Sequence, residues 1–263
     1  LQLLDAQRVF DGLRRCELVL YLGEALAATG DSEAAKGTFH QAVEIARRAE
    51  QPLLLARAAH GIAEAMWKIG LPDQPGLTAL AEAVEVLASD ESLARVQALA
   101  DLVRELGTAT EFIPGVQERA RLLSDEAMSV AMRLGDTRSR LAASIARRWV
   151  MSSSSDPSDR RASGMEILEL ARSVGDRQLI LLAHAWRIFD LMVVGDMAAV
   201  DVENDAYEAL ALEIRQSHNL WAVLARRGMR ALMQGRLADA ERLIEATRAL
   251  NPRLVQQQVD VYV

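Results

Sequence analysis

A repeat of 40 residues is the feature that most constrains how this chain can fold. The segments 131–136 and 171–176 share the pattern Ala-x-x-x-Gly-Asp and lie 40 residues apart. The match continues beyond them, and the matched pairs include Leu141 with Leu181, Ala143 with Ala183 and Gly195 with Gly235. Repeats of this length are typical of chains in which each copy buries its apolar face only against neighbouring copies. The sequence therefore predicts a stacked repeat protein.

Each copy is expected to form two helices separated by a turn that contains glycine. In the first copy, apolar residues recur at helical spacing over 16–29, Gly30 and Asp31 interrupt the pattern, and a second helix covers 32–49. In the last copy the helices cover 220–234 and 237–250. The first helices of about six repeats are predicted to begin near residues 16, 56, 96, 141, 181 and 221.

The residues around these turns resemble the tetratricopeptide repeat (TPR), whose two helices cross at small residues and turn at a Gly-Asp-like pair. The matching positions are Leu22, Gly23, Leu26, Gly30, Asp31, Ala35, Phe39 and Ala42 in the first copy, and Gly228, Gly235, Ala240, Ile244 and Pro252 in the last. The resemblance implies an all-α, right-handed solenoid of about six helix-turn-helix repeats. It predicts a single domain over 1–263, with irregular loops near 108–115 and 152–162.

The spacing of 40 residues is longer than the standard tetratricopeptide spacing of about 34. The segments 22–49 and 184–211 resemble the helical arm of large bacterial ATP-binding regulators, which are LuxR-type or adenylate-cyclase-linked proteins of the signal-transduction NTPase class. In such proteins a nucleotide-binding module precedes the repeats, and a helix-turn-helix often follows. Because the chain opens with Leu1 and shows no signal peptide, we expect a piece of a longer cytoplasmic protein.

The sequence offers few of the residue patterns on which catalysis or cofactor binding depends. Its one cysteine excludes an internal disulfide and a cysteine-based zinc site, and its four histidines do not have metal-ligand spacing. No phosphate-binding loop of the type G-x-x-x-x-G-K-[ST] occurs. The net charge of −7 gives no basic footprint for nucleic acid, and no apolar run is long enough to cross a membrane. We therefore expect a non-catalytic chain without a cofactor, and without direct nucleic-acid or membrane contact.

The single cysteine, Cys16, has two interpretations. The charges of Arg14 and Arg15 beside it could lower the pKa of its thiol and make it redox-sensitive. A buried structural thiol is the alternative that we favour.

The candidate binding surface is the concave face of the solenoid, which the first helix of each tetratricopeptide repeat lines. Carrying the family's inner positions onto this chain, with their neighbours, gives Ile145, Trp149, Ala185, Trp186, Phe189, Met192, Ala225, Arg226 and Met229. An exposed apolar strip of this kind would bind a protein, a peptide or a small effector. The alternative is that Trp149, Phe189 and Met229 pack between successive repeats.

Three functions are compatible with these observations. The first is a sensor and scaffold domain of a cytoplasmic bacterial signalling or transcriptional regulator. The second is a free-standing TPR adaptor that assembles protein complexes. The third is a hydrolase, which needs clustered titratable groups that the apolar strip does not supply. A terminal repeat left exposed would also allow the chain to self-associate.

Overall fold

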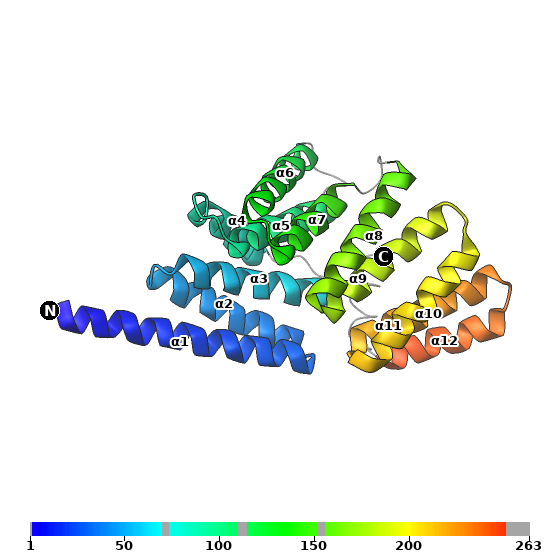
Figure 1. Cartoon of the computed structure of the whole chain (residues 1–263). Coiled ribbons are helices and arrows are strands. Elements are labelled where there is room, and N and C mark those ends of the chain that lie inside the picture. Colours follow the sequence, from blue (N-terminus) through cyan, green and yellow to red (C-terminus); the bar gives the residue numbers. More distant parts are fainter. Residues whose placement is uncertain (1, 70–73, 110–114, 152–155, 251–263) are drawn as a thin grey trace. The chain divides into compact units, whose positions relative to one another are not determined.

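The computed structural model describes residues 2–69, 74–109, 115–151 and 156–250. Within these ranges there are twelve α-helices and no strand (Figure 1), so the predicted all-α class is confirmed. The helices are α1 (Gln2–Thr29), α2 (Ser32–Arg48), α3 (Pro52–Ile69), α4 (Gln74–Val86), α5 (Leu93–Ala109), α6 (Val116–Leu134), α7 (Thr137–Val150), α8 (Pro157–Val174), α9 (Arg177–Val193), α10 (Met197–Ile214), α11 (Ser217–Met233) and α12 (Leu237–Leu250).

The chain divides into two compact units. Unit 1 covers Leu1–Ser152 and contains α1 to α7, whereas unit 2 covers Ser153–Val263 and contains α8 to α12. The boundary falls between α7 and α8, inside the fourth repeat expected from the sequence. The single repeat domain over 1–263 stays a prediction, and each unit is described separately below.

Most of the predicted helix boundaries are close to the observed ones. The first helices of the later repeats begin at Pro52, Leu93, Thr137, Arg177 and Ser217, each within four residues of its predicted start. The predicted start near residue 16 is wrong, because α1 begins at Gln2. The segment before Cys16 contains no proline, and one internal glycine, Gly12, weakens a helix without ending it.

The predicted irregular loops are shorter than expected where the structure describes them. Residues 108 and 109 belong to α5, and residues 157–162 belong to α8. Helix α8 starts early because Pro157 suits the first turn and Asp156 accepts a hydrogen bond from the Ser158 backbone N–H at 2.7 Å. The rest of both loops, at 110–114 and 152–155, lies outside the described residues, as does Pro252.

The repeated Gly-Asp pair explains how the helices end and begin. Gly30, Gly135, Gly175, Gly195 and Gly235 all have φ between +70° and +89°, a left-handed conformation that suits a residue without a side chain. In the first four pairs the following aspartate is the N-cap of the next helix, and its carboxylate accepts backbone N–H bonds. One dipeptide therefore ends one helix and starts the next within a very short turn.

In unit 1 the first helices of successive repeats pack beside one another. Contacts join α1 to α3, α3 to α5 and α5 to α7, in addition to the contacts within each pair (Figure 1). The main core of this unit includes Leu20, Ile62 and Leu80, all fully buried, together with many buried alanines. The core of unit 2 is smaller and includes Leu181, Ile188, Val200, Tyr207 and Ala211.

A phenylalanine held between two glycines fixes the packing of α1, α2 and α3. The Phe39 ring on α2 is buried, with 3% of its surface exposed. A Cβ atom added at Gly23 of α1 would lie 2.7 Å from the ring, and one added at Gly61 of α3 would lie 2.5 Å from it. Both distances are shorter than carbon atoms tolerate, so the ring fills the space that the two glycines leave. The resemblance to the tetratricopeptide repeat had identified Gly23 and Phe39 from the sequence, but not Gly61.

We predict that Gly61→Ala destabilises the chain by up to about 2 kcal/mol. The added methyl overpacks the Phe39 site, which costs about 1–3 kcal/mol, and the better helix propensity of alanine returns about 1 kcal/mol. The matched control is Gly37→Ala, because Gly37 lies in a helix, is exposed and has no atom within 4 Å of an added Cβ. Urea unfolding of the control should show a gain of about 0.5–1 kcal/mol. If the Gly61 variant were as stable as that control, the tight packing of the Phe39 ring against Gly61 would be disproved.

Cys16 is a structural thiol. Its side chain is fully buried in α1, and its Sγ lies 3.5 Å from the carbonyl oxygen of Ala42. Burial raises the pKa of the Cys16 thiol, and the charge of Glu17 raises it further, whereas Arg57 lowers it less. The redox-sensitive interpretation, which required a lowered pKa, is therefore wrong.

Candidate functional site

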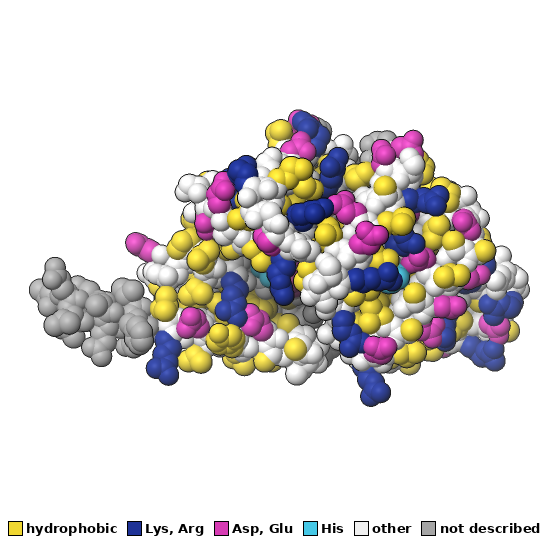
Figure 2. Space-filling view, in the orientation of Figure 1, with side chains coloured by type: hydrophobic (Ala, Val, Ile, Leu, Met, Phe, Trp, Pro, Cys, Tyr) yellow, Lys and Arg dark blue, Asp and Glu magenta, His cyan; other side chains and the backbone are white. Residues whose placement is uncertain are grey.

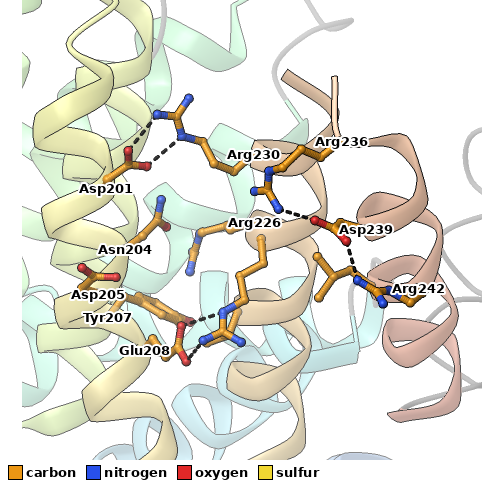
Figure 3. Close-up of a pocket in the computed structure, with 13 residues that line it drawn as sticks. Asp201, Asn204, Asp205, Tyr207, Glu208, Arg226, Arg230, Arg236, Asp239 and Arg242 are labelled. Atoms are coloured by element: carbon orange, nitrogen blue, oxygen red, sulfur yellow. Dashed lines mark hydrogen bonds and ion pairs between the residues drawn. The ribbon is translucent and has the colours of Figure 1, made fainter. Parts of the chain in front are cut away.

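A pocket of about 510 Å³ lies among α10, α11 and α12 of unit 2 (Figure 3). Charged side chains dominate its wall. The lining residues are Asp201, Asn204, Asp205, Tyr207, Glu208, Val223, Arg226, Arg227, Arg230, Arg236, Asp239, Arg242 and Leu243. Five of them are arginines and four are carboxylates, so the wall carries both charges in nearly equal number.

Helical spacing brings these side chains to one place. Helix α11 contacts both α10 and α12. The residues that α10 contributes include 201, 204, 205 and 208, and α11 contributes 223, 226, 227 and 230. Residues spaced by three, four and seven positions share one face of a helix, so each helix turns a continuous stripe toward the pocket. The stripe on α10 is mainly acidic, and the stripe on α11 is mainly basic.

Four of the five arginines are already paired with carboxylates. Arg230 donates two hydrogen bonds of 2.7 Å to Asp201, and Arg227 donates to Glu208 on the same helix, α10. Asp239 accepts from both Arg236 and Arg242 (Figure 3). Hydrogen bonds from Arg230 and Arg236 hold the pKa values of Asp201 and Asp239 below their usual range, so both acids stay ionised at neutral pH. The first two pairs join α11 to α10, whereas the pairs of Asp239 lie within residues 236–242 at the start of α12.

Arg226 differs from the other arginines in the pocket. Its guanidinium lies over the Tyr207 ring, 3.9 Å from the ring centroid, and Tyr207 is 5% exposed. Its Nη1 atom is buried and has no hydrogen-bond partner among the described residues. Of the arginines that line the described pocket, it is the one without a carboxylate partner. The ring therefore holds the guanidinium in place of an acid.

The lining residues are of types that bind charged and polar groups. No serine, threonine, cysteine, histidine or lysine is among the described residues of the wall. A nucleophile with an adjacent general base is the arrangement that most hydrolases need. Arginine and carboxylate side chains instead bind charged and polar groups by hydrogen bonds.

The structure distributes the predicted groove residues over both units. Ile145 and Trp149 lie on α7 of unit 1, where Trp149 packs against the core. The other seven lie on α9 and α11 of unit 2. Ala185 and Met192 pack against the core of unit 2, while Trp186 and Ala225 are half-buried.

Two of the predicted residues are exposed, and one lines the pocket. Phe189 on α9 is 55% exposed and Met229 on α11 is 38% exposed, so neither is a core residue of unit 2. Arg226 lines the pocket described above. That these residues form one binding groove stays a prediction.

The sequence analysis missed the rest of the pocket. Its acids and arginines are spread over α10, α11 and α12, and charged residues at helical spacing usually face solvent. Figure 2 shows such side chains of both signs intermixed over the face in view. The sequence feature that could have revealed the pocket is an acidic stripe over 201–208 followed by a basic stripe over 226–230.

A second cluster of titratable groups lies between α3 and α5 of unit 1. The ligand atoms of His60, Glu64 and Asp101 lie within 4.8 Å of one another, close enough to hold a metal ion. Arg104 nevertheless occupies the cluster, with ion pairs of 2.7 Å to Glu64 and 3.3 Å to Asp101. A guanidinium at this position competes with a metal cation for the same oxygens, so the geometry favours an ion-pair network.

The charge state of His60 supports this interpretation. Its Nδ1 lies 2.6 Å from Oδ2 of Asp101. Burial acts to lower the pKa of His60, but the charge and hydrogen bond of Asp101 outweigh it, and Glu64 adds to their effect. The result raises the pKa of His60 to about 9, so the imidazole is protonated at neutral pH and a metal ion would have to displace that proton. Sequence spacing missed this contact, because 41 residues separate the two side chains.

We predict that the His60–Asp101 pair makes stability fall as pH rises. A pKa raised in the folded state stabilises the fold fully below the unfolded value of about 6.5, and that contribution is lost between pH 6.5 and 9. Because about a third of the His60 side chain is exposed, we expect a loss of about 1–2 kcal/mol. Urea unfolding of the wild type and of His60→Gln at pH 6.5 and 9.5 measures it. If the free energy of unfolding changed by the same amount between pH 6.5 and 9.5 in the two proteins, the pairing would be disproved.

Comparison with known proteins supports the fold class. No family model matches the sequence, and no curated protein does. Among solved structures, the crystal structure of a Rap protein complexed with competence and sporulation factor is similar, with a TM-score of 0.67. The similarity covers 94% of this chain and 77% of that chain at 13% sequence identity. The predicted TPR-like helical repeat fold is therefore confirmed, and at this identity the likeness extends to the fold alone.

None of the helices in the described ranges combines the length and the apolar character that crossing a bilayer requires.

Proposed function

We propose that this chain is a non-catalytic helical-repeat scaffold that binds a peptide or protein segment in the pocket among α10, α11 and α12. The observation that carries the proposal is the pocket itself, whose wall is built of arginines and carboxylates. A peptide backbone and its polar side chains offer donors and acceptors that such a wall can satisfy. The fold adds support, since the Rap protein of similar fold was crystallised with competence and sporulation factor.

The pocket lies between two successive repeats of unit 2, so a ligand bound there would contact both. Helix α10 belongs to one repeat, whereas α11 and α12 form the next. A ligand that contacts all three helices stabilises one angle between the two repeats, because each repeat contacts only its neighbours. We therefore infer that ligand binding restricts the curvature of unit 2, which gives a scaffold a means to report occupancy.

The finer proposal is a sensor and scaffold domain of a cytoplasmic bacterial signalling or transcriptional regulator. It rests on the resemblance of 22–49 and 184–211 to the helical arms of LuxR-type and adenylate-cyclase-linked regulators. A free-standing TPR adaptor is the alternative. The flanking coding sequence separates them, because a phosphate-binding loop upstream supports the regulator and its absence from the complete gene supports the adaptor.

The pocket makes a direct prediction about peptide binding. Asn204 lines the pocket from α10, and replacing it with tryptophan fills the space that a ligand would occupy. Peptides selected from a random display library on the wild-type chain should bind Asn204→Trp at least tenfold more weakly. Fluorescence anisotropy of the selected peptides measures the affinity.

The matched control for this experiment is Val202→Trp. Val202 lies two residues away on α10, is 68% exposed and does not line the pocket. The control should bind the selected peptides as tightly as the wild type does. If both variants bind them unchanged, or if no peptide is selected, the pocket is not the binding site.

The exposed apolar residues on α9 and α11 provide a separate test of the predicted groove. Phe189→Ala and Met229→Ala should each weaken binding of a partner that lies along this strip, by about threefold to tenfold. Because both side chains are exposed, the free energy of unfolding should change by less than about 1 kcal/mol. Trp149→Ala is the contrasting variant, since this side chain packs against the core and its loss should destabilise unit 1. Large destabilisation by the first two variants would mean that they pack in the core.

A further inference from the structure

We propose that Arg226, held by Tyr207, is a subsite for an oxyanion, either a carboxylate or a phosphate group of the bound ligand. The inference rests on the proposed function, because it specifies which chemical group the pocket selects. Three observations support it: the pairing of the other arginines, the buried donor of Arg226 and the position of Arg226 in the repeat.

The pairing pattern makes Arg226 the available cation in the described pocket. Its four arginine neighbours in the wall each bond to an acid on α10 or α12. The wall thus contains five arginines against four carboxylates, and the excess positive charge is not neutralised by an ion pair to Arg226. An incoming anion therefore meets four arginines that already bond to carboxylates, two of which share Asp239, and one arginine that does not.

The buried Nη1 of Arg226 requires an acceptor. A buried N–H group without a partner has lost its hydrogen bonds to water, and the loss costs more when the group is charged. Contact with the Tyr207 ring occupies one face of the guanidinium, whereas the N–H donors lie at its edge. A planar edge with two parallel donors matches a carboxylate or a phosphate in bidentate geometry. In Figure 3 the Arg226 side chain extends from α11 toward α10, across the pocket.

The repeat shows that an arginine at this position is unusual within the chain. Helices α7, α9 and α11 begin at Thr137, Arg177 and Ser217, so their residues correspond at intervals of 40. The positions that correspond to Arg226 hold Ala146, which is fully buried, and Trp186, which is half-buried. Packing alone therefore favours an apolar residue here. The arginine introduces a charged donor where the other two repeats have apolar packing.

The test uses arginine side-chain NMR signals of the full chain, with sodium acetate and sodium phosphate as the probes. Ionic strength is held constant with sodium chloride, and the Arg226 signal is identified by its absence from Arg226→Gln. We expect the Arg226 signal to shift saturably with at least one probe, while the signals of the paired arginines shift much less. Saturation with acetate alone identifies a carboxylate subsite, and saturation with phosphate alone identifies a phosphate subsite. A shift that stays linear with both probes overturns the proposal.

Two variants separate a specific subsite from a general charge effect. Arg226→Gln and Arg227→Gln remove the same charge from the same pocket, but Arg227 is paired with Glu208. Affinity for the active probe, followed by the shifts of backbone amides of α11, should fall at least fivefold in Arg226→Gln and less than twofold in Arg227→Gln. Equal losses would overturn the proposal. Circular dichroism confirms that both variants are folded, and the wild-type titration decides the question without them.

The outcome is distinguishable from failure of the proposed function. If the library peptides bind Arg226→Gln as tightly as the wild type but are lost by Asn204→Trp, the pocket binds peptides and the oxyanion subsite is wrong. If the probes saturate at Arg226 while Asn204→Trp leaves peptide binding unchanged, the subsite is correct and the peptide-binding function of the pocket is wrong.

Discussion

Close approach of neighbouring helices is the constraint on which the rest of this structure depends. Each helix pair must bury its apolar face on the adjacent pair, and alanine and glycine at the crossings allow backbones to come near enough. Ala35, Ala42 and Ala46 on α2 are fully buried, and the Phe39 ring fits only because Gly23 and Gly61 lack side chains. The short Gly-Asp turns serve the same end, because they reverse the chain without a loop that would separate the helices.

The pocket arises where this rule is relaxed. In unit 1 the main core cluster is built mainly of alanines, larger aliphatic side chains and the Phe39 ring, and the ion-pair network of His60, Asp101 and Arg104 lies beside it between α3 and α5. On α11 the stripe that faces α10 carries Arg226, Arg227 and Arg230. Arginines are long, and ion pairs with acids on α10 direct them, so the two helices enclose a space between polar walls. The same repeat geometry therefore gives a mainly apolar core in one part of the chain and a charged cavity in another.

The difference between the apolar core and the charged pocket explains which features the sequence could predict. The fold class and most helix boundaries could be predicted, because the spacing of apolar residues and the Gly-Asp turns act locally. Gly61 could not be recognised from its own repeat, since its role depends on a ring supplied by the preceding helix. The pocket could not be predicted either, because the ion pairs between α10 and α11 join residues 19 and 29 positions apart, and charged helical residues are usually solvated. Of the residues predicted for the groove, Arg226 is the one that lines the described pocket.

Arg226 also shows how a charged residue can replace an apolar one in a repeat protein at small cost to the fold. Stability in such arrays is a sum of contributions from each repeat and each neighbour interface, so a polar substitution weakens one interface and leaves the others intact. The last described repeat lies at the edge of unit 2, where α12 carries exposed Leu237 and Ile244 and one buried residue, Ala240. An arginine there gives up less apolar contact than it would at the Phe39 site, where three helices share one ring. A ligand that binds the Arg226 guanidinium and contacts α10 would add a contact across this interface, so its binding would favour a more rigid arrangement of the two helices.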